Sequence, residues 1–447
     1  MAPGDDRDQP DDPGDDDSDQ SGGDPTPDPF GGANPFGGAN PFGGANPFGG
    51  GNPFENLPMF GDLAKMLSGQ GPLNWDAARQ FAILTAAGDD AAGAMSGASP
   101  MSPITTGNVE PTVRIEYEQL ADVARLHVGD VMGLEAPTVA PSVATPQQWA
   151  AETLEAYRPL FTEMATSLGG TDDLPAEVAG DPMAQMMAGI SKMMAPAMMG
   201  MAVGSMVGSL ARQAFGVYDL PIPRATPALV LVPPTIDAFA DQWSITRDEM
   251  RLWVLSHELA GATLFGVDHL ATHVRDLVRR HVGAFRPDPQ ALTDKLGSLD
   301  IESGDPMAAM QQAVGDPELL RGAVRSQEQL AMEPILDAAM ATTIGLIDWV
   351  VDAVAARVIG GNALQIAEAV RRRRAEVSPD DRFVERLLGV RLGAEQTARG
   401  KAFVQGVVDR AGDDGITRLF RDPDAIPTPN EVDAPGLWLA RVDPENS

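Results

Sequence analysis

The sequence predicts a mainly α-helical domain with a small β element, preceded by a disordered N-terminal extension. After residue 57, apolar residues recur three and four positions apart, which is the spacing of one helix face. One short apolar run bounded by prolines is the only convincing strand. The preceding residues lack both helical and strand periodicity. We therefore expect an acidic tail over 1–28, a repeat linker over 29–56 and a helical domain over 57–447.

The N-terminal extension has two compositions. Residues 1–28 contain eleven aspartates and one arginine, too little apolar surface to offset the entropy lost on ordering. From Pro29 the hexapeptide "PFGGAN" occurs three times, followed by "PFGGGN". Its Gly-Gly and Asn-Pro steps favour turns and extended chain. The repeats predict a flexible spacer, and their regularly spaced phenylalanines leave open a role in self-association or in docking a partner.

Composition restricts the class of function. The chain has 447 residues, 43% of them hydrophobic, which is enough for a sizeable core. Its 64 acidic residues against 32 basic ones disfavour binding to nucleic acid and to anionic membranes. The absence of cysteine excludes disulfides, thiolate zinc sites and cysteine catalysis. The first residues resemble no export signal, so we expect a cytoplasmic protein; no pattern fixes an oligomeric state.

Three amphipathic segments predict the first helices of the domain. Apolar residues at helical spacing cover 75–87, 116–134 and 145–168. Thr145 stands where an N-cap residue would begin the third segment. The stretch "DDLPAEVAGDP" after it breaks the helical pattern and predicts a loop.

A methionine-rich stretch, 183–215, follows this loop. Eighteen residues from Met193 to Leu210 carry no charge, close to the minimum for spanning a bilayer. Small residues recur at every fourth position, as on helix faces that approach closely: Gly200, Gly204 and Gly208. However, Lys192 and Pro196 interrupt the stretch and no basic loop flanks it. We therefore predict a central buried helix, with a membrane span as the alternative.

The next two elements are a strand and a helix. The apolar run Ala228 to Val232, between prolines, predicts the strand. A helix should then run from Arg247 to Phe265, with Thr246 and Glu249 forming a capping box at its start. Four residues should share its buried face: Leu252, Leu255, Leu259 and Ala262.

The middle of this helix begins like a zinc-protease motif. Residues 255–266 read "LSHELAGATLFG". In H-E-x-x-H, two histidines on one helix face bind a zinc ion and the glutamate polarises the attacking water. His257 matches the first ligand and Glu258 the general base. Gly261 stands where the second histidine belongs and has no side chain to ligate with.

Several stretches in a specific order carry a resemblance to a known family. They are "GVYDLPIP" followed by the strand, "RDEMRLWVLSHELAGATLFGVDHL", "GLIDWVVDAV" and "AVRRRRAE". This order resembles an actinobacterial family of zincin-like proteins, from about Asn74 to Leu439. Its members are labelled zinc-dependent metalloproteases or hydrolases, and some are labelled as associated with biosynthesis of a deazaflavin coenzyme. The resemblance implies a zincin-like helical fold and a zinc cofactor.

The resemblance also implies where a third metal ligand belongs. The family's later helix reads L-V-E-G-W-V-D, with its glutamate as ligand; "LIDWVVD" here places the shorter Asp348 at that position. Losing one of four ligands costs on the order of 3 kcal/mol of zinc affinity. His269 and His273 form a second i, i+4 pair, "HLATH", which is either unconnected or, after a turn at Gly266, brings His269 back toward His257.

Two functions follow as alternatives. In the first, the chain is a degenerate family member that binds a protein or peptide partner between the helices that bear His257 and Asp348. In the second, it is an active zinc-dependent metallohydrolase whose site is completed by Asp348 and His269, with Glu258 as the base. The run Arg371 to Arg374 indicates a solvated helix end or an anchor for acidic loops rather than a nucleic-acid site.

Overall fold

The structure is a computed structural model that describes most of the domain expected after residue 57. The described residues are 71–88, 108–169, 182–286, 326–376, 385 and 387–443. They belong to one compact unit, Leu57–Ser447. The acidic segment 1–28 and the repeats 29–56 lie outside the described residues.

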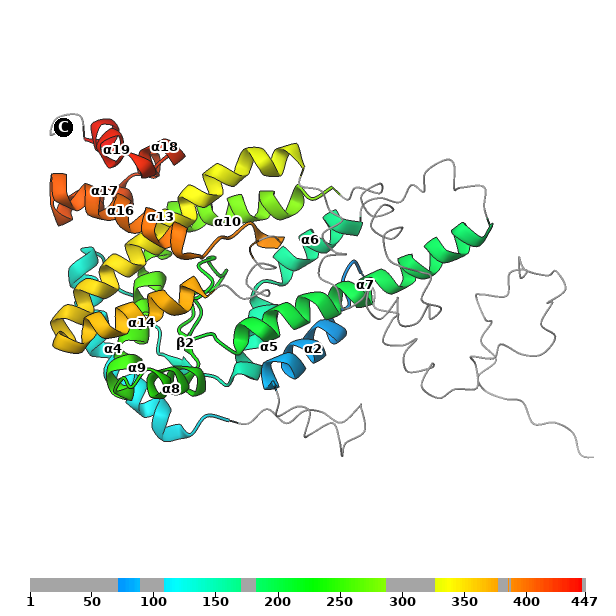
Figure 1. Ribbon diagram of the computed structural model, residues 1–447, viewed down its shortest axis with the longest axis horizontal. Helices are drawn as coiled ribbons and strands as arrows, with labels where there is room; N and C mark the ends of the chain where they lie inside the picture. Colours follow the sequence, from blue (N-terminus) through cyan, green and yellow to red (C-terminus); the bar gives the residue numbers. More distant parts are fainter. Residues whose placement is uncertain are drawn as a thin grey trace, which may run out of the picture. The chain divides into compact units, whose positions relative to one another are not determined.

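The described part of the chain is mainly helical, with one small β element, as predicted (Figure 1). The α-helices are α2 (Trp75–Ala87), α4 (Pro111–Met132), α5 (Pro146–Ala156), α6 (Arg158–Gly169), α7 (Pro182–Ala211), α8 (Pro233–Gln242), α9 (Arg247–Leu264), α10 (Asp268–Gly283), α13 (Gln327–Val358), α14 (Ala363–Ala375), α16 (Ala394–Ala411), α17 (Asp413–Arg421), α18 (Pro429–Asp433) and α19 (Pro435–Val442). Short 3₁₀ turns, η3 (Gly360–Asn362) and η4 (Pro423–Ala425), join some of them.

The third predicted helical segment is two helices. Thr145 caps α5 as predicted and forms a full capping box with Gln148, whose amide oxygen accepts the Thr145 backbone N–H at 2.9 Å. The chain then leaves the helix at Tyr157. Pro159 explains the break, because proline lacks the N–H that would continue α5 and is tolerated in the first turn of a new helix, α6.

The start of α9 differs from the sequence prediction in its capping. Thr246 is the N-cap residue, but its side chain makes no capping hydrogen bond, so the predicted capping box is wrong. The Glu249 carboxylate instead accepts the side-chain amide of Asn362 at 3.0 and 3.1 Å. Glu249 thus bonds Asn362 of the turn η3 and not the backbone N–H of Thr246, as a capping box would require.

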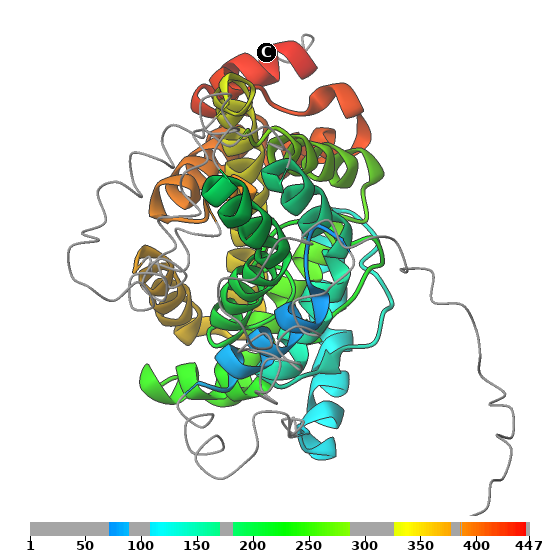
Figure 2. The same ribbon diagram turned by 90° about the vertical axis from the view of Figure 1, so that its right-hand side faces the viewer.

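The glycine stripe of α7 is a helix contact within the domain. α2 and α7 lie side by side in both views (Figures 1 and 2). A Cβ on any of three α7 glycines would overlap the backbone of α2: Gly200 at Asn74, Gly204 at Ala78 and Gly208 at Ala82. The four-residue spacing therefore lets the two backbones approach closely.

The central buried helix of the described domain is α13, not the methionine-rich α7. Two described segments are long and apolar enough to cross a membrane, Met194–Ala211 and Gln327–Val358. Within the domain, 44% of Met194–Ala211 is buried, against 83% of an apolar 18-residue window of Gln327–Val358. A core helix satisfies the same length and hydropathy criteria, and α13 packs against α4, α9, α10 and α16. The prediction of a central buried helix over the methionine-rich stretch is therefore wrong, because less than half of its described segment Met194–Ala211 is buried.

The β element positions a loop beneath α9. Strand β1 (Ser142–Val143) pairs in parallel with β2 (Val230–Leu231), so the predicted strand is confirmed in two of its five residues. On its other side, Leu231 forms an antiparallel bridge with Gly216. This bridge fixes the loop 215–219, which is the start of the "GVYDLPIP" stretch.

Candidate functional site

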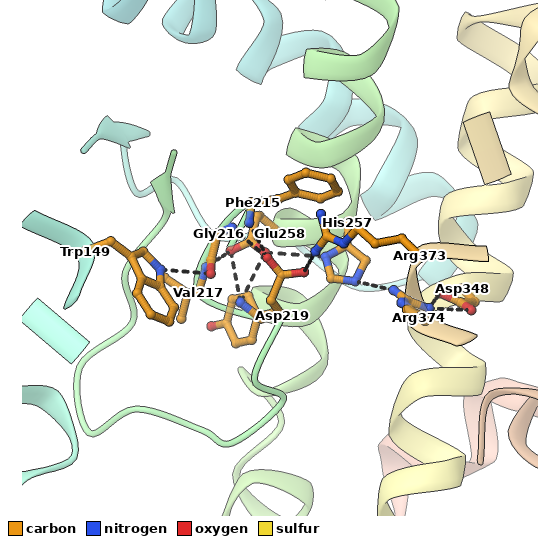
Figure 3. Close-up of polar contacts among 11 residues, drawn as sticks. Trp149, Phe215, Gly216, Val217, Asp219, His257, Glu258, Asp348, Arg373 and Arg374 are labelled. Atoms are coloured by element: carbon orange, nitrogen blue, oxygen red, sulfur yellow. Dashed lines mark hydrogen bonds and ion pairs between the residues drawn. The ribbon is translucent and has the colours of Figure 1, made fainter. Parts of the chain in front are cut away.

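The site lies where α9, α13 and α14 meet the loop 215–219 (Figure 3). It borders a pocket of about 120 Å³. The polar side chains that line the pocket include His257, Asp348 and Arg374, and its apolar walls include Ile347 and Leu392. Both His257 and Asp348 are buried. The fold has therefore brought together two of the three residues that the sequence predicted as metal ligands.

A guanidinium group joins these two residues. Nη1 of Arg374 donates to Oδ1 and Oδ2 of Asp348 at 2.8 and 2.9 Å. Its Nη2 lies 3.3 Å from Nε2 of His257. Guanidinium nitrogens only donate, so Nε2 accepts and the imidazole proton belongs on Nδ1. Nδ1 is 3.4 Å from Oε1 of Glu258.

The Asp348 carboxylate stabilises the charge of Arg374 inside the domain. Burial acts to lower the pKa of Arg374, but the neighbouring carboxylate outweighs it and holds that pKa above the ordinary value. Hydrogen bonds between two ionised groups are stronger than those between neutral ones, and here a single nitrogen of Arg374 meets both oxygens of Asp348. The cation at this position is therefore supplied by the chain itself.

Glu258 faces backbone amides. Its Oε2 accepts the N–H groups of Val217 at 2.6 Å and Tyr218 at 3.2 Å, and Oε1 also accepts from Tyr218 at 3.1 Å. The residue is fully buried and does not line the pocket. Burial raises the pKa of its carboxyl, and the hydrogen bond from His257 opposes that shift. This carboxylate fastens α9 to the loop.

The loop is shaped to receive that carboxylate. A Cβ on Gly216 would overlap the Glu258 carboxyl group. The Gly216 carbonyl accepts the indole N–H of Trp149 at 2.9 Å, and its own N–H donates to Asp219 at 3.0 Å. Asp219 also accepts from the backbone of Phe215. The stretch "GVYD" thus forms a turn around Glu258 (Figure 3).

The place of the missing second histidine is filled. A Cβ on Gly261 would lie 2.5 Å from Cγ of Tyr218 and 2.9 Å from its Cβ. Real Cβ atoms essentially never come this close to another carbon. Tyr218 is itself buried, with its ring 5.8 Å from that of Phe265. Tyr218 therefore packs against the α9 backbone at Gly261, where the side chain of a second metal-binding histidine would project.

The structure does not bring His269 to His257. His269, near the start of α10, has its Nε2 2.9 Å from the backbone carbonyl of Leu419 in α17. His273 lines a second, smaller pocket, and burial lowers its pKa. Because α10 begins at Asp268 and faces α17, the turn after α9 carries the "HLATH" pair away from the site. Among the described residues, no group of three or more His, Asp or Glu side chains could hold a metal ion.

The residues of the site do not fit a zinc ion. Glu258 is hydrogen-bonded to the backbone, and Gly261 offers no ligand. The remaining candidates, His257 and Asp348, both bond the positively charged Arg374. A catalytic zinc needs three protein ligands and an open position. These side chains therefore support no hydrolytic step through a metal.

Two residues of the site, Arg374 and Tyr218, were not singled out from the sequence. The arginine run was the available signal, and both of its interpretations describe part of it: Arg372 is exposed at the helix end, whereas Arg373 pairs with Asp219 of the loop 215–219. Its ion pairs are Arg371 with Asp352, Arg372 with Glu368, Arg373 with Asp219 and Arg374 with Asp348. Arg373 also lies over the ring of Phe215, 3.6 Å from its centroid. Tyr218 was part of a quoted stretch, but nothing local marks it as the partner of Gly261.

The fold and the half-motif on α9 define a helical domain of the metallopeptidase type. The family model described as zincin-like metallopeptidase matches residues 73–439, and the chain belongs to this family. Among solved structures, it is similar to a protein from Chloroflexus aurantiacus described as "a putative hydrolase with a novel fold". The identity is 22% and the TM-score 0.54, over 83% of this chain and 99% of that one, a likeness of fold. No curated protein matches the chain.

Proposed function

We propose that this chain is a non-hydrolytic member of the zincin-like metallopeptidase family that binds a protein or peptide partner in its pocket. The observation that carries the proposal is the state of Glu258. A general base must reach the water or substrate that it deprotonates. Here both carboxylate oxygens accept backbone N–H groups of the loop and the residue is fully buried.

The pocket supports the binding half of the proposal. Its volume of about 120 Å³ is close to that of a cavity that holds one benzene-sized group. Apolar walls that also carry polar side chains are the usual composition of a ligand site. A single apolar side chain of a partner fits this space, with polar groups of the partner facing Arg374 and Asp348.

The two halves of the proposal, the absence of hydrolysis and the binding of a partner, can be tested separately. The first test concerns Glu258. We expect Glu258→Gln to lower the free energy of unfolding by about 1–3 kcal/mol. In either orientation the amide NH₂ faces hydrogen-bond donors, either the loop N–H groups or Nδ1–H of His257. Thermal unfolding measures the loss, and a quenched-fluorescence peptide library with added zinc measures hydrolysis. Neither the parent nor Glu258→Gln should cleave the library.

The matched control is Asp248→Asn, which changes an exposed carboxylate in the first turn of the same helix. It should unfold like the parent. Zinc-dependent cleavage by the parent that Glu258→Gln abolishes, with unchanged thermal stability, would identify Glu258 as a catalytic base and overturn the proposal. That result would restore the metallohydrolase alternative.

The binding half is tested by filling the pocket. Peptides selected from a random display library on the parent protein should bind Leu392→Trp roughly 10- to 100-fold more weakly, because the indole occupies space meant for one apolar side chain. Leu392 lines the pocket and is only half-buried, so the larger side chain is tolerated. Titration calorimetry measures the affinity.

Leu364→Trp is the control for this variant. Leu364 lies on α14 with 76% of its surface exposed and does not line the pocket. The selected peptides should bind it with the parent's affinity. Equal binding to Leu392→Trp and the parent would show that the pocket is not the binding site.

A further inference from the structure

We propose that Arg374 is the resident cation of this site and that the position between His257 and Asp348 is a guanidinium-binding site. In this chain the side chain of Arg374 fills it. Removing that side chain should leave a site that accepts small guanidinium compounds in trans. The inference does not depend on what the pocket binds.

The geometry of the hydrogen bonds carries the first step. One nitrogen of the guanidinium meets both oxygens of Asp348, and a second nitrogen meets the imidazole Nε2. A lysine ammonium is a single point charge, whereas guanidinium is a planar fork that reaches acceptors in two directions. The acceptors come from α9 and α13 and the donor from α14. The three helices are thus joined at one positive centre.

The acceptors are held in place independently of Arg374. The imidazole of His257 stacks on Trp253, with ring centroids 5.7 Å apart, and its Nδ1 faces Glu258. Glu258 is in turn fixed by the loop N–H groups of Val217 and Tyr218. Asp348 is buried in the central helix α13. A preorganised pair of acceptors should survive truncation of the arginine.

The site is also accessible from the pocket. Arg374 lines the pocket, and 19% of its side chain is exposed, compared with 6% for Asp348. Truncating the side chain therefore opens space that is continuous with the pocket. A small planar cation can enter from there and meet the same acceptors.

The experiment is rescue of Arg374→Ala by methylguanidinium at millimolar concentration. Removing one partner of a buried pair leaves Asp348 without its counter-charge, so we expect the melting temperature to fall by about 5–10 °C. Methylguanidinium should recover much of this loss, because it binds the folded state alone. Methylammonium at the same concentration should not.

Arg372→Ala is the matched control. It removes a neighbouring arginine of the same helix whose side chain is 63% exposed and pairs with Glu368. Its melting temperature should stay near that of the parent and should not respond to methylguanidinium. An Arg374→Ala protein that melts like the parent, or that gains no more from methylguanidinium than Arg372→Ala does, would overturn the proposal.

Two further measurements apply if Arg374→Ala fails to fold. Arg374→Lys keeps the charge but not the fork, so it should fold and melt below the parent; equal melting temperatures would overturn the proposal. Added zinc or a chelator should leave the parent's melting temperature unchanged. Stabilisation of the parent by zinc that His257→Ala abolishes would show that a metal displaces the guanidinium, and would also overturn it.

Discussion

Gly261→His is expected to destabilise the domain severely instead of restoring a metal site. The new Cβ would lie 2.5 Å from Cγ of Tyr218 and 2.8 Å from its Cδ2, so the tyrosine must move before any side chain fits at this position. Tyr218 has little freedom to move, because its N–H is bonded to Glu258 and its ring packs beside Phe265. The better helix propensity of histidine contributes less than about 1 kcal/mol. We expect a net loss of about 3 kcal/mol or more.

Thermal unfolding and the soluble fraction on expression measure this effect. Gly361→His is the control, because a Cβ at that exposed position meets nothing within 4 Å. Combining Gly261→His with Tyr218→Ala should recover part of the loss, since the second change removes the overlapping ring. A stable Gly261→His protein that hydrolyses peptides with zinc would contradict this expectation. It would show that Tyr218 moves aside at little cost in stability.

Gly204→Leu is expected to separate α2 from α7. A Cβ at Gly204 would overlap the carbonyl oxygen of Ala78, and one at Gly208 would lie 2.5 Å from that of Ala82. The clash is with backbone, so a change of side-chain rotamer does not relieve it. The helices must move apart and lose a contact that buries the alanines of α2. The expected loss in the free energy of unfolding is about 3 kcal/mol or more.

Ala195→Leu makes the same kind of addition on the exposed side of α7 and should unfold like the parent. Chemical denaturation of both variants measures the difference. If Gly204→Leu were as stable as Ala195→Leu, then the close approach of α2 and α7 would not contribute to stability. The comparison also tests the origin of the glycine spacing, because helix contact within the domain accounts for it without a membrane.

The non-hydrolytic proposal accounts for how the site holds together through the chain's own side chains. His257 and Asp348 still converge, and a guanidinium supplies the positive charge that their acceptor atoms require. Without Arg374, a buried carboxylate would have no counter-charge, which is costly in a domain interior. Under the proposed function, the three helices remain joined at the site through Arg374, and Glu258 holds α9 to the loop 215–219 instead of acting as a general base.

Local patterns predicted those features that local forces decide. Helix α2 and the N-cap of α5 agree with the sequence prediction, since amphipathic spacing and a capping threonine act within a few residues. The predicted capping box at Glu249 failed because Asn362, more than a hundred residues away, competes for the carboxylate. The sequence pattern could not predict which of α7 and α13 is the more buried. Both helices are apolar, and their burial depends on the neighbours that the fold provides.

By itself, the sequence determined the helical class, the position of the half-motif and the inability of Gly261 to bind a metal, because these follow from the residues alone. Only the tertiary structure decided what occupies the vacated positions. Tyr218 fills the space beside the glycine, and Arg374 meets His257 and Asp348. These contacts join segments far apart in the chain, and their energies depend on burial and on distances of a few ångströms. No sequence spacing encodes such quantities.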